Sequence, residues 1–143
     1  MKMKHFCKRA VCAAPVCVLS LLLLVSCSGG VSREEATQTT EDFLRALGTQ
    51  DFAAAEALLH PECPLDPEKR FGVLQSESGL DFSEGIRIQK YTGFSSSYYD
   101  SSVGGSRYEL TVVTTVGDRA VTFVIETVRN DAGYGIYNVD IKT

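Results

Sequence analysis

The chain has 143 residues, of which 44% are hydrophobic, and it carries 14 basic and 18 acidic residues. Such a size and composition suit one globular domain with its own hydrophobic core. An acidic balance without a basic cluster argues against nucleic-acid binding, which depends on lysine and arginine neutralising phosphates.

The N-terminal segment has the pattern of a secretory signal. Four basic residues lie within residues 2–9, and residues 10–25 are apolar apart from Ser20. A positive start followed by an apolar run is typical of such signals. Sixteen helical residues reach roughly 24 Å, short of the roughly 30 Å hydrocarbon core of a bilayer. A permanent transmembrane helix is therefore the weaker interpretation.

The end of this run, Leu24-Val25-Ser26-Cys27, resembles the lipobox of bacterial lipoproteins. The resemblance implies that residues 1–26 are removed and that Cys27 receives a diacylglyceryl group. A thiol suits that reaction because sulfur is a strong nucleophile. Residues 27–31 then form the lipidated end and a short tether. The alternative is an ordinary secretory signal cut near Ser26 or Ser28, with Cys27 left as a thiol.

The resemblance also predicts a location. Two acyl chains anchor a protein stably, so we expect a domain held on a membrane and facing outside the cytoplasm. In a single-membrane host this is the cell membrane. In a double-membrane host Ser28 replaces the Asp that usually signals inner-membrane retention, which favours the outer membrane. Four of the 14 basic residues and none of the 18 acidic ones precede Cys27, so the mature charge is −8.

The cysteines follow the same division. Three of the five precede Cys27, and Cys63 is the other one that remains in the mature chain. No disulfide can form within a mature chain whose Cys27 is lipidated. Cys63 is then either a free thiol or a partner in an intermolecular disulfide, which the compartment permits.

Helical patterns come first in the mature chain. Ser32 and Glu35 have capping-box spacing, and an apolar stripe follows up to Gly48 at Ala36, Thr40, Phe43, Leu44 and Leu47. Asp51 caps a second helix over residues 52–59, which Pro61 stops. Asp66-Pro67 opens a short third helix through residues 68–75, with Phe71 and Leu74 facing inward. Residues 76–85 read as a loop.

Four strand patterns follow, at residues 85–94, 106–116, 119–128 and 134–142. Their alternation and β-branched content predict β-strands, and the tight turns between the last three predict that these three form an antiparallel meander. The residues expected to share one face of each strand, the apolar one, are Tyr108, Leu110, Val112, Thr114 and Val116, then Val121, Phe123, Ile125 and Thr127, then Tyr137, Val139 and Ile141. Residues 95–106 read as a polar loop. We predict a single α+β domain over residues 32–143, with two to three helices packed on a curved four-stranded sheet.

This order of elements resembles the nuclear-transport-factor-2-like superfamily, the α+β cone shared with ketosteroid isomerases. In these relatives the second helix often opens as it does at Asp51, Phe52 and Ala53, and the last strand often reads as at Tyr134, Ile136 and Val139. The family more often has Trp at the first of these last positions, and this chain has no Trp. The resemblance implies a conical pocket that catalyses, binds a ligand or mediates dimerisation. A cystatin-like fold is the alternative.

Few residues point to chemistry. No isomerase motif can be transferred position by position, so we assign no catalytic residue and no cofactor. His60 and Cys63 could form half a metal site or a nucleophile–base pair, but Pro61 breaks the helix between them, and we expect no metal. Tyr98 and Tyr99 in the polar loop, together with Tyr91, are the candidate ligand or partner contacts, since exposed aromatics make good anchors.

Three functional hypotheses remain. The first is a non-enzymatic, membrane-anchored lipoprotein that binds a small ligand or an envelope protein. The second is a lipid-anchored enzyme of the isomerase or dehydratase type. The third is an accessory subunit that forms a homodimer through the open sheet face, favoured if Val113, Val124 or Val128 lies on a flat exposed patch.

Overall fold

A computed structural model describes residues 29–143, and the predicted signal segment and Cys27 lie outside the described residues. Within that range the chain is α+β, as predicted, with three α-helices followed by a four-stranded antiparallel sheet. In chain order the elements are α1 (Arg33–Gly48), α2 (Phe52–Ala57), α3 (Pro67–Ser78), the 3₁₀ turn η1 (Phe82–Glu84), β1 (Ile86–Asp100), β2 (Gly105–Val116), β3 (Arg119–Asn130) and β4 (Gly133–Lys142).

Each helix begins at a side-chain cap that the sequence predicts. Ser32 and Glu35 form both halves of the capping box at the start of α1. Asp51 accepts a hydrogen bond from the amide of Ala54 at 3.0 Å, and Asp66 accepts one from the amide of Lys69 at 3.0 Å. Such caps each stabilise a helix by about 1 kcal/mol. The helix ends differ from the predictions: α2 stops at Ala57, and α3 continues to Ser78.

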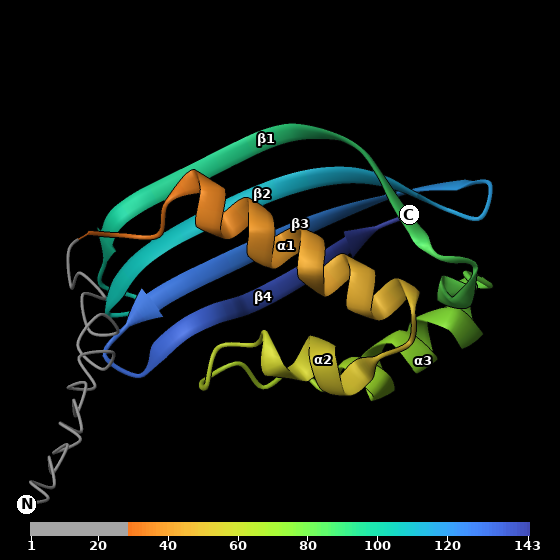
Figure 1. The fold of residues 1–143 in the computed structure, drawn as a ribbon, viewed down its shortest axis with the longest axis horizontal. Helices are drawn as coiled ribbons and strands as arrows, with labels where there is room; N and C mark the ends of the chain where they lie inside the picture. The colour runs from red at the N-terminus through yellow and green to blue at the C-terminus, as the bar shows by residue number, and fades with distance from the viewer. Residues whose placement is uncertain (1–28) are drawn as a thin grey trace, which may run out of the picture.

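The strands follow one another in the order β1-β2-β3-β4 (Figure 1). The predicted loop at residues 95–106 is wrong, because Ser95–Ser97 pair with Arg107–Glu109 and only a short turn joins Asp100 to Gly105. A strand at the edge of a sheet is held by backbone hydrogen bonds to one neighbour and needs no continuous apolar face. A serine-rich segment can therefore complete it.

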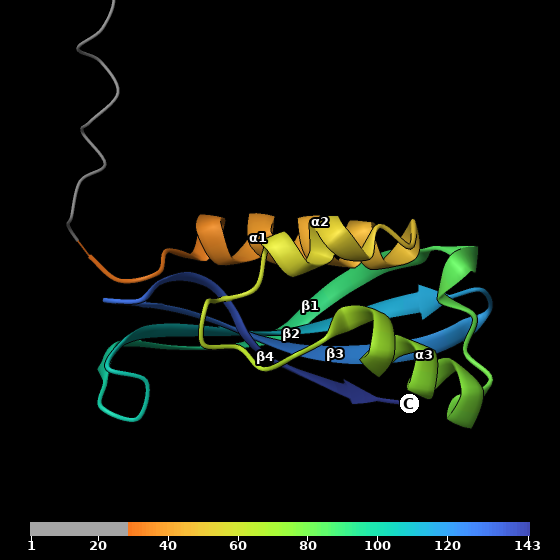
Figure 2. The same cartoon turned by 90° about the horizontal axis from the view of Figure 1, so that it is seen from below.

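Helix α1 lies across one face of the sheet, which we call the helix face (Figures 1 and 2). The predicted inward residues of β2 and β3 are all buried, from Tyr108 to Val116 and from Val121 to Thr127 in alternation. The whole predicted stripe of α1 is buried as well. Phe71 of α3 and Phe82 of η1 extend this core in edge-to-face contact, with ring centroids 5.2 Å apart.

A β-bulge in β4 changes the predicted face of that strand. Asn138 pairs with Glu126 while Ile136 pairs with Thr127, so Tyr137 is an extra residue. A bulge of this kind reverses the alternation on one side of itself. Ile136 is consequently fully buried, whereas Tyr137 is partly exposed. The bulge therefore interrupts the regular alternation that was expected to place Tyr137, Val139 and Ile141 on one face.

A search of residues 29–143 finds no helix with the length and apolar character needed to cross a bilayer.

Candidate functional site: the open edge of β1

Aromatic side chains gather along β1, the first edge strand of the sheet. Phe94 and Tyr99 are each 67% exposed, and Tyr98 is 77% exposed. Tyr91 is half-buried on the same strand. Tyr91 and Phe94 pair with Val112 and Leu110 and so share the helix face. We call Phe94, Tyr98 and Tyr99 the exposed aromatics of β1.

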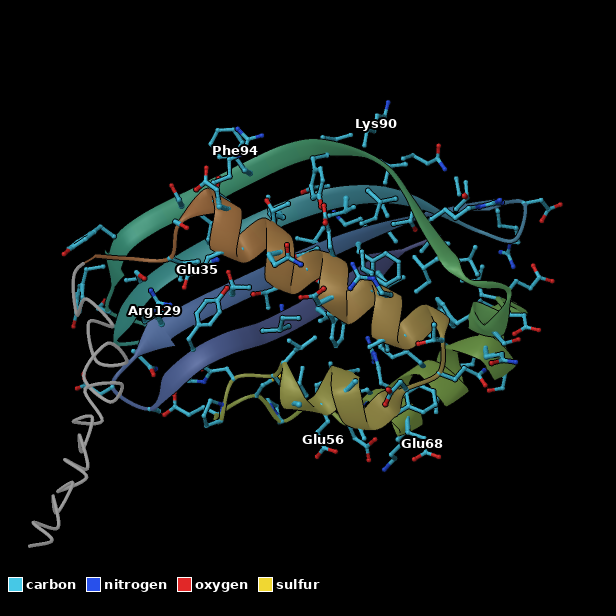
Figure 3. All side chains as sticks on the ribbon, in the orientation of Figure 1. Glu35, Glu56, Glu68, Lys90, Phe94 and Arg129 are labelled. Carbon is cyan, nitrogen blue, oxygen red and sulfur yellow. The ribbon has the colours of Figure 1, made fainter. Side chains whose placement is uncertain are left out.

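Phe94 lies beside the N-terminal end of α1 (Figure 3). Its ring stacks on the buried ring of Tyr108, with centroids 6.3 Å apart and an interplanar angle of 16°. The guanidinium of Arg33 lies 5.8 Å from its centroid, a contact worth about 0.5–1 kcal/mol at exposed sites. Phe94 was not among the residues predicted from the sequence. In the sequence, the feature that could have indicated it is a large apolar residue directly before a run of serines.

Tyr91 links β1 to α1 through its hydroxyl group. Its hydroxyl donates a hydrogen bond to Oε1 of Glu41 on α1 at 3.0 Å. Burial, together with this carboxylate, raises the pKa of Tyr91 to about 12. The phenol is therefore neutral at physiological pH and holds β1 against α1. The predicted group of Tyr91, Tyr98 and Tyr99 is thus divided, with Tyr91 seven residues along the strand from Tyr98.

The outer edge of β1 pairs with no other strand in the part of the chain that the structure describes. Register shifts interrupt β1 after Ile88 and after Tyr91, and again beyond Ser97. Bulges and charged residues such as Lys90 discourage pairing with another chain. Between the bulges, Gly93–Ser97 pairs with β2 without interruption. This segment is the regular part of the open edge.

The N-terminal end of the described chain is fixed at the same end of the sheet. The amide of Val31 donates a hydrogen bond to Oγ of Ser106 at 2.8 Å. A Cβ atom on Gly30 would lie 3.5 Å from a ring carbon of Tyr98 and 2.9 Å from Cβ of Ser106. Val31, which the sequence analysis counts with the tether, packs against the hydrophobic core. The chain thus enters the domain beside Tyr98.

His60 has a structural role. Its Nδ1 accepts a hydrogen bond from the amide of Glu62 at 3.1 Å, so Nε2 carries the proton and donates to Oδ1 of Asn130 at 3.0 Å. The side chain is fully buried and its ring meets Tyr137 edge-on. Both ring nitrogens are engaged in these hydrogen bonds, so the imidazole is not free to act as a base toward Cys63. Burial also raises the pKa of the Cys63 thiol, which lowers its reactivity.

Metal-binding groups do not gather in this structure. Across residues 29–143, no three His, Cys, Asp or Glu side chains lie close enough together to hold a metal ion. His60 and Cys63 are joined instead through the backbone, where the amide of Cys63 donates to the carbonyl of His60 at 2.9 Å.

Open hollows lie on the surface of the described part of the chain. One, of about 470 Å³, is mostly polar and lies between the β1–β2 turn and the β3–β4 turn, lined among others by Glu62, Val103, Asn130 and Tyr137. Another, of about 400 Å³, lies between Pro64 and Val73. Neither is lined by residues of the helix face. The middle of that face, where the superfamily resemblance implies a conical pocket, is occupied by the buried side chains of α1.

The outer face of the sheet carries charge rather than a flat apolar patch. Arg107 lies 3.1 Å from Asp100, 3.4 Å from Glu126 and 3.8 Å from Glu109. Val113 and Val124 are partly exposed there, but Val128 is fully buried. The apolar patch that would favour dimerisation through this face is therefore reduced to two valines.

No protein-family model matches this chain, and no curated protein sequence is significantly similar to it.

Proposed function

We propose that the chain is a lipid-anchored, extracytoplasmic and non-enzymatic domain that binds an envelope protein through the open edge of β1. The observation that carries this proposal is the contrast between one unpaired, aromatic-lined edge and a sheet that is otherwise covered or charged. The lipobox resemblance at Cys27 supplies the anchor.

The chemistry of the described residues supports a binding role over an enzymatic one. His60 has both ring nitrogens engaged within the fold. The closest acid–phenol pair, Glu41 and Tyr91, is satisfied internally. An isomerase-type reaction needs a free acid or base that faces a pocket. Of the acids that line the two hollows, Glu62 accepts a hydrogen bond from the side chain of Asn130 and Asp66 caps α3.

The partner would be a protein with an extended segment. Backbone groups of Gly93–Ser97 on an open, regular strand edge can accept another strand, a mode in which main-chain hydrogen bonds supply affinity. The neighbouring ring of Phe94 offers a side-chain contact to such a segment. A small apolar ligand is supported less, because α1 fills the helix face.

We also propose that the domain belongs to one of two α+β superfamilies. A helix that lies across a four-stranded antiparallel meander supports both the nuclear-transport-factor-2-like and the cystatin-like interpretation. The filled helix face favours the cystatin-like one, because a conical ligand pocket would need that space.

A photo-crosslinking side chain at Ser95 tests the partner contact in native envelopes. Ser95 is exposed on the regular part of the edge, and Lys142, exposed on β4, is the matched control position. We expect a crosslinked envelope protein from position 95 and none from position 142. Equal labelling at both positions, or none at position 95, would contradict the proposal.

A second candidate, the dimerising accessory subunit, is favoured by the same edge. Two copies of β1 can pair antiparallel about a two-fold axis, which is the commonest symmetry of homo-oligomers. The Ser95 crosslink separates the two candidates, because a homodimer gives an adduct with twice the mass of the chain.

A further inference from the structure

Two exposed tyrosines lie next to the point where the chain enters the domain. Gly30 lies against Tyr98, and Val31 is fixed by its hydrogen bond to Ser106. Tyr99 follows Tyr98 directly at the end of β1, before the turn into β2. In Figures 1 and 2 this turn lies at the same end of the domain as the start of α1, and α3 lies at the opposite end.

Gly30 lies three positions after Cys27 in the chain. An extended chain of that length reaches at most about 10 Å. If Cys27 carries a diacylglyceryl group, as the proposed function holds, the lipid headgroups come within that reach of Gly30. The end of the sheet that holds Tyr98 is therefore the end nearest the membrane.

Tyrosine rings favour this position. Tyrosine has an apolar ring and a polar hydroxyl, and it is enriched at the level of lipid headgroups. Tyr98 and Tyr99 are 77% and 67% exposed, so both rings are available to a surface. The geometry points to a membrane contact: Tyr98 and Tyr99 insert into the headgroup layer and orient the anchored domain with its β1–β2 turn toward the lipid.

Electrostatic attraction contributes little to this contact. Arg107 is flanked by Asp100, Glu109 and Glu126, and Arg129 is paired with Glu35 (Figure 3). The mature chain has more acidic than basic residues. The lipid contact thus depends on the tyrosine rings and not on anionic lipids, and a zwitterionic membrane suffices. Phe94, farther along β1, remains for the protein partner.

Single tryptophans test the orientation directly, because the chain has no Trp of its own. The mature, lipidated protein is prepared with Tyr98→Trp or Tyr99→Trp and placed in phosphatidylcholine vesicles that contain brominated acyl chains. Val73→Trp is the control, since Val73 is 45% exposed on α3. We expect a blue shift and a loss of emission for Trp at positions 98 and 99, and neither for Trp at position 73. Adding phosphatidylglycerol leaves the result unchanged.

The outcomes separate this inference from the function on which it rests. Mass analysis of the N-terminal peptide first shows whether Cys27 carries lipid, and its absence overturns both proposals. With lipid present, unquenched emission from positions 98 and 99 overturns the membrane contact alone. Shielding of these positions in native envelopes but not in vesicles also overturns it, and assigns the two tyrosines to a protein partner.

Discussion

The two edge strands of the sheet differ in how their outer sides are used. The outer side of β4 is covered at Ile136, because the amide of Ile136 donates to the carbonyl of Leu58 at 2.9 Å and the amide of His60 donates to the carbonyl of Ile136 at 2.8 Å. The outer side of β1 has no such cover in the described chain. One edge thus contributes to stability, while the other keeps its backbone groups free for a partner.

The covered edge should be the more sensitive to added volume. A Cβ atom on Gly135 would lie 2.5 Å from the backbone nitrogen of His60 and 2.6 Å from the carbonyl carbon of Leu59. Gly135→Ala therefore forces the covering segment away, and we expect a loss of about 3 kcal/mol in the free energy of unfolding.

Gly93 on β1 is the matched control. A Cβ atom there meets nothing closer than Oγ1 of Thr111 at 3.5 Å. Alanine also restricts the unfolded chain, so Gly93→Ala should change stability by less than about 1 kcal/mol, in the stabilising direction. Urea denaturation of both variants checks the pair, and equal effects at the two glycines would remove the proposed difference between the edges.

The segment Leu58–His60, which covers β4 at Ile136, is also held in place by the side-chain hydrogen bonds of His60. His60→Leu keeps most of the volume but leaves the amide of Glu62 without its acceptor, and it removes one of the two donors to Oδ1 of Asn130. We expect a loss of about 2 kcal/mol. Glu62→Gln, at a side chain that is 52% exposed, serves as control and should stay within about 0.5 kcal/mol. Thermal unfolding that does not distinguish the two variants would argue against the structural role of His60.

A third change lies in the core between the two edges. Thr40 is fully buried on α1, and its hydroxyl has no hydrogen-bond partner among the described residues. Thr40→Val keeps the shape and removes the unpaired group, so we expect a gain of about 1 kcal/mol. Thr40→Ser keeps the hydroxyl, loses a methyl group and should destabilise. A valine variant less stable than the wild type would contradict this account.

The smallest expected change in stability concerns the hydrogen bond between Tyr91 of β1 and Glu41 of α1. Tyr91→Phe removes the hydrogen bond to Glu41 and should cost less than about 1 kcal/mol at neutral pH, since the pair is partly exposed. The pKa of Tyr91 is raised from 10.0 to about 12 in the folded state. Its stabilising contribution is complete below pH 10 and is lost as the pH rises toward 12. Stability curves of the two proteins should therefore converge over that range, and a constant difference would be the contrary result.

Local signals predicted most of the fold. The three caps at Ser32, Asp51 and Asp66 act over a few residues, so their spacing was sufficient. The alternating burial of β2 and β3 followed from their period of two residues. These strands lie in the middle of the sheet, where one face must be buried and the pattern is clearest.

The edges were predicted less well, for a physical reason. The serines of β1 carry no apolar alternation, because an edge strand is held mainly by its backbone. The bulge at Tyr137 depends on the register with β3, which the pattern of one strand does not contain. The contacts of His60 with Asn130 and of Tyr91 with Glu41 join residues 70 and 50 positions apart. Candidate sites built from such pairs need the structure.

Metabolic labelling with a fatty acid tests the central claim, that Cys27 tethers this domain to a membrane. The wild type and two variants, Cys27→Ser and Cys63→Ser, are expressed in a bacterial host and compared. Cys63 is the matched control because it is the other cysteine beyond the predicted signal. We predict label on the wild type and on Cys63→Ser and none on Cys27→Ser. Label that persists in Cys27→Ser, or that is missing from the wild type, would contradict the account.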